Sequence, residues 1–407
     1  MKNKHTPEIR FSGFTTGWEQ RKLNELVTPV VREVPKPDRP YERISVRSHA
    51  KGTFHQKVDD PKTVSMDKLY VVKENDLLVN ITFAWEHAIA VASKKDDGLL
   101  VSHRFPTYII DKSDINFIRY SVSQEKFRKK MELISPGGAG RNRVLNKKDF
   151  VNLKIDAPTQ IEEQAKIGKF FKKLDDIIDL HQHELTTLKQ AKQGFLRKMF
   201  PKGLELVPEV RFSGFSGDWE YRKLGNHAEI LTGGTPKTQM QEYWEPKEIP
   251  WMSSGEVNKK RLSSTDNMIS KLGFEKSSAR WVKKNSVLIA LAGQGKTRGT
   301  VAINQIPLTT NQSIAAIVPK GELHYEFIFQ SLEKRYNELR LISSGDGTRG
   351  GLNKQLVSDV EIISPSIEEQ IKIGNFFKQF DNMIEIHQRE LEVLKKAKEA
   401  FLQKMFV

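Results

Sequence analysis

The chain has 407 residues, enough for two or three domains with a core each, and its 66 Lys and Arg against 51 Asp and Glu give a formal charge of +15. It has no cysteine, which excludes disulfides, zinc–thiolate sites and thiol nucleophiles and fits a reducing, cytoplasmic location. The start MKNKHTPEIRFSGF lacks the apolar core of a secretory signal, and no apolar run is long enough to predict a membrane span.

The excess of positive charge favours a polyanionic partner, of which nucleic acid is the commonest. A basic protein with no such partner is the alternative that charge alone leaves open.

Two segments of the chain occur twice. PEIRFSGFTTGWEQRKL at 7–23 returns as PEVRFSGFSGDWEYRKL at 208–224, and residues 161–200 return as 367–406 with about 25 of 40 aligned positions identical. The chain is therefore an internal duplication of two domain-sized units, not a solenoid of short repeats. The expected organisation is a first head at 1–157, a long helix at 158–200, a linker at 201–207, a second head at 208–364 and a second long helix at 365–407.

The two heads share little sequence but the same predicted plan. Each has β-rich runs, then an amphipathic helix, then a Gly/Arg loop followed by Leu-Asn-Lys. Strands are expected at 76–83, 88–94 and 100–110 with a helix at 115–135, and at 249–254, 286–292 and 300–306 with a helix at 324–343. A retained scaffold with divergent loops predicts two readers with different targets.

Residues 290–297, ALAGQGKT, loosely match a phosphate-binding loop. Such a loop must open a helix, so that its N–H groups and lysine face the phosphates. The residues after Thr297 include Gly299, two β-branched residues and Pro307, which indicate a strand and a turn. We therefore predict a basic loop between two strands. No other catalytic motif stands out, and no catalytic residue or metal ligand is assigned; a metal nuclease site is not excluded.

Residues 161–200 and 367–406 each predict one long helix. Thr159 with Glu162 and Ser366 with Glu369 have capping-box spacing. Apolar residues then recur at alternating steps of three and four, which is the seam of a coiled coil. The predicted seam residues are Phe171, Leu174, Ile178, Leu185, Leu188, Phe195 and Met199, and then Phe377, Phe380, Ile384, Leu391, Leu394, Phe401 and Met405.

Polar residues interrupt both seams at equivalent places, namely His181 and Lys192 in the first and His387 and Lys398 in the second. We expect them to set the register of the helices; a metal site or a pH switch at the histidines is the alternative. Helices that share a seam pattern most simply pair with each other, antiparallel about a pseudo-twofold axis. The predicted fold class is therefore α+β, with two β-rich mixed α/β heads separated by an antiparallel coiled coil of two helices of about 40 residues.

Polar and basic residues in the head loops are the candidate DNA contacts. Arginine matches guanine through two donors, and asparagine or glutamine matches adenine. The alternatives for each are a solvated side chain or a structural ion pair, and Trp85 is equally consistent with a core position. The candidates are Arg47, Ser48, His49, Lys51, Trp85, His87, Arg104, Arg141 and Arg143 in the first head, and Ser253, Ser254, Gln294, Lys296, Arg298, Asn311, Gln312 and Arg349 in the second.

Over essentially its whole length the chain resembles the specificity subunit of a type I restriction–modification enzyme. The most specific matches are the two leaders, the passages LNKKDFVNLKIDAPTQIEEQ and LNKQLVSDVEIISPSIEEQ, and the helix ends FLRKMF and FLQKMF. The resemblance implies two target recognition domains and no catalytic activity in this chain. It also implies double-stranded DNA and two modification subunits, which carry S-adenosylmethionine and methylate adenine, as partners. Two restriction subunits with ATP- and magnesium-dependent translocase and nuclease activity can join them.

The segment ITFAWEHAIAV of the first head departs from this pattern because it lacks the Gly-rich loop of the second head. Each head is expected to lie in a major groove. A rod of about 60 Å spans at most about 18 base pairs, and heads that face the same side of the duplex would lie about one turn, or 10 base pairs, apart. Because the heads differ, the predicted site is asymmetric, with two unlike half-sites around an unread spacer. A stand-alone bipartite regulator, an ATP-dependent enzyme and a scaffold that binds only proteins are the rival functions.

Overall fold

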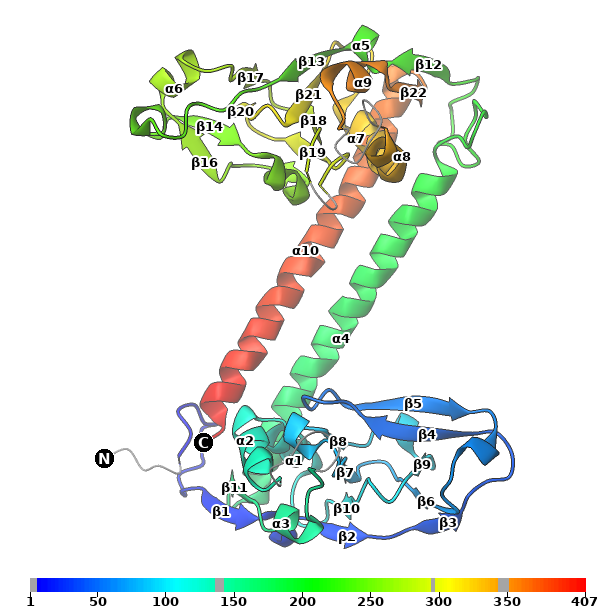
Figure 1. Ribbon diagram of the computed structural model, residues 1–407, viewed down its shortest axis with the longest axis vertical. Coiled ribbons are helices and arrows are strands. Elements are labelled where there is room, and N and C mark those ends of the chain that lie inside the picture. Colours follow the sequence, from blue (N-terminus) through cyan, green and yellow to red (C-terminus); the bar gives the residue numbers. More distant parts are fainter. Residues whose placement is uncertain (1–5, 136–142, 294–296, 343–350) are drawn as a thin grey trace. The chain divides into compact units, whose positions relative to one another are not determined.

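The computed structural model describes residues 6–135, 143–293, 297–342 and 351–407 (Figure 1). The contacts of the chain divide it into two compact units. The first contains the chain up to Gln182 together with Arg389–Val407, and the second contains His183–Gln388. Each unit therefore combines one head with segments of both long helices.

Each unit contains a sheet with the same strand order. In the first unit the antiparallel order is β2 (Thr28–Val30), β10 (Thr107–Ile109), β7 (Leu77–Val79) and β8 (Ile89–Val91). In the second unit it is β13 (Ala228–Thr232), β21 (Ile314–Pro319), β18 (Val287–Ala290) and β19 (Val301–Asn304), with β15 (Arg261–Leu262) added parallel to β19. The common plan predicted for the two heads is confirmed.

The central strand of this sheet is buried on both faces, which explains its continuous apolar sequence. In β7, Leu77 and Val79 pack into the core beside the long helices, and Leu78 packs into a second core on the opposite face. In β18, Val287 and Ile289 lie in one core and Leu288 in the other. This alternation is the period of two that a strand imposes on its side chains.

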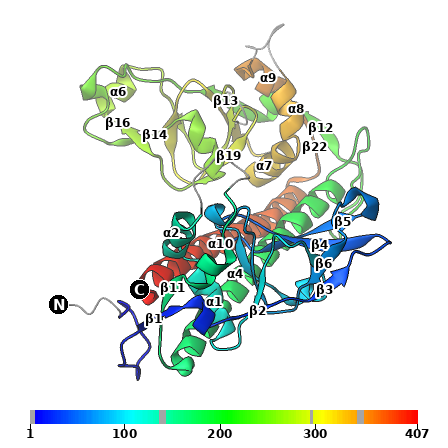
Figure 2. The ribbon, with the colours of Figure 1, turned by 60° about the horizontal axis from the view of Figure 1, so that its bottom comes forward.

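The second sheet of each head differs between the units. The first unit has the order β3 (Glu33–Pro35), β6 (Lys68–Val71), β9 (Leu100–Val101), β4 (Tyr41–Val46) and β5 (Thr53–Val58). Figure 2 shows β3, β4, β5 and β6 side by side. The second unit has the order β16 (Asn267–Ile269), β14 (Ile249–Met252), β20 (Leu308–Thr310) and β17 (Trp281–Val282). The divergence in sequence is therefore accompanied by a divergence in the second sheet.

The prediction of one amphipathic helix in each head, at 115–135 and 324–343, is wrong in detail, because each of these segments forms two helices. These are α1 (Ile115–Val122) and α2 (Glu125–Leu133), and α7 (Tyr325–Lys334) and α8 (Tyr336–Leu341). Gln124 has an extended ψ of 146° and Arg335 a ψ of 17°, so neither residue continues the preceding helix. The short helices are α3 (Lys147–Val151), α5 (Leu224–His227), α6 (Lys271–Glu275) and α9 (Lys354–Asp359).

The repeated leader of each unit docks on the start of a long helix. Its strands are β1 (Glu19–Lys22), paired antiparallel with β11 (Lys154–Ala157), and β12 (Glu220–Lys223), paired antiparallel with β22 (Glu361–Ser364). The guanidinium of Arg10 donates to both carboxylate oxygens of Glu163 (2.5 and 2.7 Å), and Arg211 does the same to Glu369 (2.8 and 2.7 Å). Both glutamates are 1% exposed, so the shared leader sequence encodes one buried contact, made twice.

The long helices form over the predicted ranges. Helix α4 covers Ile161–Lys198 and helix α10 covers Ile367–Met405, which confirms two helices of about 40 residues. The predicted capping boxes are only half right. The hydroxyl of Ser366 accepts a hydrogen bond from the N–H of Glu369 (3.4 Å), but the carboxylate of Glu369 binds the leader arginine.

In α4, Gln160 occupies the position that Ser366 has before α10, so the predicted cap at Thr159 lies one residue too early. The carbonyl of Gln160 accepts the hydrogen bond of Gln164 N–H (3.4 Å), and the carbonyl of Ser366 accepts that of Gln370 N–H (3.0 Å). The residue before the first turn of α4 is therefore Gln160 and not Thr159.

The two long helices pair antiparallel within each unit, as predicted. Along α4 in the first unit, the partners are Phe170 with Phe401 (ring centroids 5.2 Å apart), Asp175 with Lys398, and His181 with Glu390 (3.5 Å). In the second unit they are Glu184 with His387 (3.5 Å), Lys192 with Asp381 (2.6 Å), and Phe195 with Phe376 (5.2 Å). The predicted seam residues are buried or half-buried except Phe195, which is 37% exposed, and the adjacent Leu196 is buried instead.

An aromatic cluster in each unit is completed by the end of the other repeat's helix. In the first unit the ring of Phe406 lies near those of Trp18, Phe117 and Phe171 (centroids 6.3, 5.6 and 5.7 Å). In the second unit the ring of Phe200 lies near those of Trp219, Phe327 and Phe377 (6.1, 5.2 and 6.0 Å). The core of the first unit is therefore complete only when the last residues of the chain are in place.

Candidate nucleic-acid interface

A backbone junction at Ile81, just after β7, gathers the predicted reading loops of the first head. The N–H of Ile81 donates to the carbonyl of Arg104 (3.0 Å), and its carbonyl accepts from the N–H of Leu145 (2.8 Å). The Ile81 side chain belongs to the apolar core, which fixes the junction. The loop that carries Arg104 and the segment that carries Arg143 are thereby held at the same end of the sheet.

Leu291, just after β18, makes the equivalent junction in the second head. Its N–H donates to the carbonyl of Ser313 (2.8 Å), and its carbonyl accepts from the N–H of Leu352 (3.0 Å). The loop that carries Asn311 and Gln312 is therefore held where the first head holds the loop of Arg104. Equivalent scaffold positions carry unlike side chains in the two heads.

The tip of the β4–β5 hairpin adds a third segment to the first junction. The N–H groups of His49 and Ala50 donate to the carbonyls of Glu86 and His87 (2.8 Å each), and the hydroxyl of Ser48 donates to the Glu86 carboxylate (2.5 Å). His49 and Ala50 have φ of 60° and 50°, a left-handed conformation that these contacts stabilise. The tip is therefore docked on the short helix η3 (Ala84–Glu86).

The docked tip presents Arg47, His49 and Lys51, whose side chains are exposed. The guanidinium of Arg47 lies 5.1 Å from the centroid of the Phe54 ring and donates to the carbonyl of Thr53. These contacts orient Arg47 and leave other N–H donors of its guanidinium able to meet a base or phosphate.

Trp85 and Arg143 form a pair at the same place. The guanidinium of Arg143 lies 4.9 Å from the Trp85 ring centroid, and both side chains are half-buried. Arg104 is exposed, and its N–H is held by the hydroxyl of Ser102 (3.3 Å). Trp85 is thus a platform for Arg143 rather than a fully buried core residue.

His87 is a correction to the predicted DNA contacts. Its side chain is 3% exposed, its Nε2 lies 2.7 Å from the carbonyl of Val122, and its φ of 63° ends helix η3. Burial lowers the pKa of His87, because the charged form would lose its water. His87 is a structural residue of the core and does not face a ligand.

Two of the predicted contacts in the second head serve the fold locally. Ser253 caps the helix η7 (Ser254–Lys259), with its N–H donating to the carboxylate of Glu256 (3.0 Å). The side-chain oxygen of Asn311 accepts the N–H of Ser313 (3.1 Å). The N–H of Asn311 donates to the carbonyl of Met252 (3.0 Å), which places Ser254 and Gln312 on adjoining segments.

Gln312 is exposed and its side-chain oxygen accepts a hydrogen bond from Thr235 (2.6 Å). Arg298 is half-exposed on the connection between β18 and β19, which are antiparallel neighbours. In the described residues, the phosphate-loop pattern therefore joins two strands instead of opening a helix, as predicted. The predicted contacts Arg141, Gln294, Lys296 and Arg349 lie outside the described residues.

A buried ion network that the sequence did not predict joins the second head to the long helices. Arg261 on β15 donates to both oxygens of Glu326 (2.7 and 2.9 Å) and to Asp381 (2.8 Å). Lys192 donates to Asp381 and to Glu333 (2.6 Å each). No local motif could have revealed the network, because its partners are 65 to 189 residues apart.

Neighbouring charges hold Lys192 and Glu333 of the network in their charged forms. Burial by itself would lower the pKa of Lys192, but the carboxylates of Glu333 and Asp381 outweigh it and leave the pKa raised. Burial would likewise raise the pKa of Glu333, whereas Lys192 and Lys260 hold it below its ordinary value. These contacts fix β15 and α7 against the segments of α4 and α10 that belong to the second unit.

Comparison with known proteins identifies a family. The Type I restriction modification DNA specificity domain matches this chain twice, at residues 16–190 and 216–396. The MjaIX specificity subunit of Methanocaldococcus jannaschii is 31% identical over 183 residues, which are 44% of this chain and 41% of that protein. The MjaVIII specificity subunit of the same organism is 26% identical over 351 residues, or 83% and 79% of the two chains.

The same fold occurs in the S subunit of a type I restriction–modification system from M. genitalium, with a TM-score of 0.67, 16% identity and 99% of both chains covered. The chain spans less than half the length of the MjaIX subunit that it matches. Within the described ranges, no helix is both long and apolar enough to cross a bilayer.

Proposed function

Because this chain belongs to the family of type I restriction–modification DNA specificity proteins, we propose that it reads a bipartite, asymmetric DNA site with two unlike heads. Its formal charge of +15 suits a polyanion. The observation that carries the proposal is the pair of junctions at Ile81 and Leu291, which hold different loops at equivalent positions of one scaffold.

The proposed readers are the side chains that the junctions present. In the first head they are Arg47, His49, Lys51, Arg104 and Arg143, with Ser48 and Trp85 as supports; in the second they are Ser254, Arg298 and Gln312. Arg141, Gln294, Lys296 and Arg349 keep the same proposed role on sequence grounds. Arginine can bind guanine through two donors and glutamine can bind adenine, so the two sets suit different bases.

The proposed spacing follows from the long helices. A helix of 38 residues is about 57 Å long at 1.5 Å per residue. Such a rod spans at most about 17 base pairs, and heads on one side of a duplex would read half-sites about one helical turn, or 10 base pairs, apart. The base pairs between them would go unread.

The chain itself is proposed to have no catalytic residue and to act in the cytoplasm with partner enzymes. Two modification subunits would supply S-adenosylmethionine and adenine methylation, and two restriction subunits would supply ATP- and magnesium-dependent cleavage. The rival, a stand-alone DNA-binding regulator, would purify without methyltransferase chains.

The test is to express the chain with its neighbouring methyltransferase subunits and map methylated adenines in the host DNA. We expect one motif with two unlike halves and a fixed unread spacer. A palindrome or an uninterrupted motif would contradict the proposal, and no methylation together with a sequence-specific footprint from the isolated chain would favour the regulator.

A further inference from the structure

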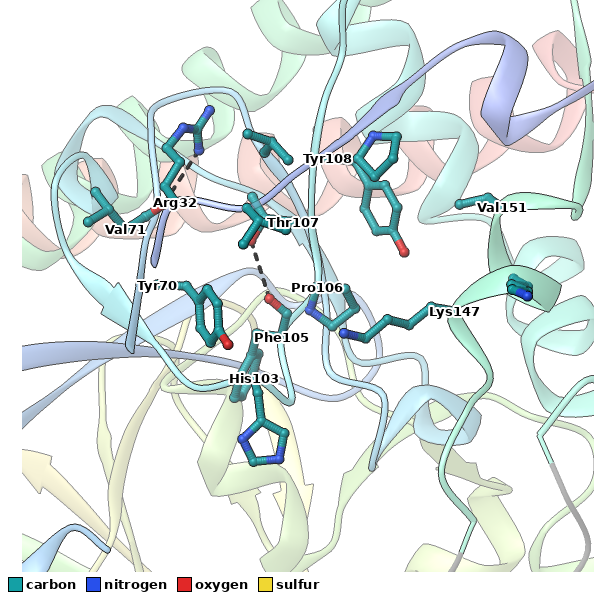
Figure 3. A pocket seen from close by; sticks show the side chains of 14 residues that line it. Arg32, Tyr70, Val71, His103, Phe105, Pro106, Thr107, Tyr108, Lys147 and Val151 are labelled. Atoms are coloured by element: carbon teal, nitrogen blue, oxygen red, sulfur yellow. Dashed lines mark hydrogen bonds between the residues drawn. The ribbon is translucent and has the colours of Figure 1, made fainter. Parts of the chain in front are cut away.

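A pocket of about 340 Å³ opens in the first head between β2, β10, β6 and α3 (Figure 3). Tyr70, Phe105, Pro106 and Tyr108 form much of its wall, and four valines add further apolar surface. This volume is within the range of sites for small ligands. The walls therefore suit one flat ring system with a substituent.

One wall of the pocket carries a polar group without a partner. Tyr108 is 2% exposed, and its ring packs on Phe150 with centroids 5.3 Å apart. In the described part of the chain nothing hydrogen-bonds to its hydroxyl, which Figure 3 shows directed toward the side chains of Pro106 and Lys147. Burial raises the pKa of Tyr108 to about 12, so the group stays a neutral donor. The hydroxyl is not among the fully enclosed side-chain atoms that lack a partner, so it opens to the pocket, where an acceptor of a ligand can replace water.

The mouth of the pocket is positively charged. Lys147, Lys148 and His103 line it and are exposed, and no carboxylate pairs with them among the described residues. Arg32 also lines the pocket but is already bound to Asp76 (2.5 and 3.2 Å). The described lining contains no acidic residue, so an anionic group is the complement.

We propose that this pocket binds a nucleotide, with the base against Tyr70 and Phe105 and an acceptor of the base on the Tyr108 hydroxyl. The phosphate would lie at Lys147 and Lys148. Aromatic side chains stack on any base, and lysine is a common phosphate ligand.

Two sources share this chemistry. One is a free nucleotide, and the other is a nucleotide of the bound DNA that has left the base stack. The second source rests on the proposed function and is favoured by sequence adjacency, since His103 of the pocket precedes Arg104 of the proposed reading loop. A protein side chain seated in the pocket is the competing occupant.

The experiment uses the full chain assembled with its methyltransferase subunits and two probes. The first probe is each deoxynucleoside monophosphate, titrated by calorimetry. The second is the mapped target duplex with 2-aminopurine at each position in turn, where unstacking raises the fluorescence. The adenines that become methylated are left out, because a methyltransferase itself unstacks the base that it modifies. Binding of a monophosphate, or a fluorescence rise at one of the remaining positions, supports the proposal and identifies the source.

Variants connect either signal to the pocket. Lys147→Ala with Lys148→Ala should weaken the signal tenfold or more, and Tyr108→Phe about three- to tenfold, because each removes a hydrogen bond to the ligand. Lys95→Ala, an exposed lysine of the same head outside the pocket, is the matched control and should change nothing. The melting temperature of each variant verifies that the head is folded.

If neither the titration nor the fluorescence gives a signal, the proposal is overturned. A double variant that loses its methyltransferase subunits while its nucleotide signal is unchanged also overturns it, because the pocket would then hold a protein. Binding of a free monophosphate does not require sequence-specific DNA binding. If a monophosphate bound to the pocket but no methylated motif were found, the proposed function would be refuted and the nucleotide site would stand.

Discussion

The ammonium of Lys192 lies 2.6 Å from the carboxylate of Asp381, and the repeat places Lys398 against Asp175 in the same way in the first unit. The environments differ, since the Lys192 side chain is 10% exposed and the Lys398 side chain 25%. Asp175 also accepts the hydroxyl of Tyr120 (2.6 Å). The same pair of residues therefore makes a buried contact in one unit and a partly hydrated one in the other.

Replacing Lys192 with Met should lower the free energy of unfolding of the second unit by at most about 3–5 kcal/mol, because Asp381 and Glu333 each lose one buried cation but keep Arg261 and Lys260. Lys398→Met should cost only about 1 kcal/mol, since water reaches that pair. Urea unfolding of the full chain measures both, with the exposed Lys189→Met as control. Equal losses at the two positions would show that burial does not set the difference.

Acidification should weaken the first unit through His87. Its pKa is lowered by burial, so between that pKa and the ordinary 6.5 the unfolded chain binds a proton that the folded chain does not. The free energy of unfolding should thus be constant above about pH 6.5 and fall as pH drops below it. His87→Asn, which tolerates the left-handed backbone, should flatten this part of the profile, and His103→Asn, at an exposed histidine of the same unit, should not.

Phe406→Ala should destabilise the first unit by about 3–5 kcal/mol, because it empties the centre of the cluster with Trp18 and Phe117. The equivalent Phe200→Ala should do the same to the second unit. Limited proteolysis with identification of the fragments measures the effect unit by unit. If Phe406→Ala exposed cleavage sites only in the second unit, the assignment of the helix end would be wrong.

Arg104→Ala should weaken binding to the target by about 1–3 kcal/mol and relax one base position of one half-site, as expected for a contact with guanine. Arg128→Ala is the control, because Arg128 lies on the same head and bonds to Glu125 and Glu132. A binding selection over randomised half-sites makes the measurement. A uniform loss over all sequences would indicate a phosphate contact instead.

A chain that ends at Val207 should form a symmetric dimer. Residues 183–200 repeat the sequence of 389–406, so Phe200 of one copy can fill the place of Phe406 in another. Light scattering should give twice the mass of the truncated chain. Phe200→Ala in this short chain should give monomers or aggregates, and a wild-type short chain that stays monomeric would contradict the prediction.

The repeat, the two long helices and their seams could be predicted from the sequence because they depend on local periodicity. An amphipathic helix shows its buried stripe every three or four residues, and a duplicated stripe implies a partner of the same kind. The strands of the shared sheet can be predicted for a similar reason, since β7 and β18 are buried on both faces and their sequences are therefore continuously apolar.

The reading loops could be predicted only in part. Arg104 and Arg47 are basic loop residues and are exposed, but His87 has the same sequence features and is buried against the carbonyl of Val122. Residue type and loop position do not report the direction of a side chain, which depends on contacts made by distant segments.

The duplication, the helix pairing and the common plan of the heads follow directly from the sequence, because each rests on patterns that recur along the chain. The folded chain is needed to bring the loops together at Ile81 and Leu291. It is also needed to join Arg261 to Glu326 and Asp381, and to place Phe406 in the core beside Trp18. These contacts join residues far apart in the chain, and their energy depends on burial and geometry that no local pattern encodes.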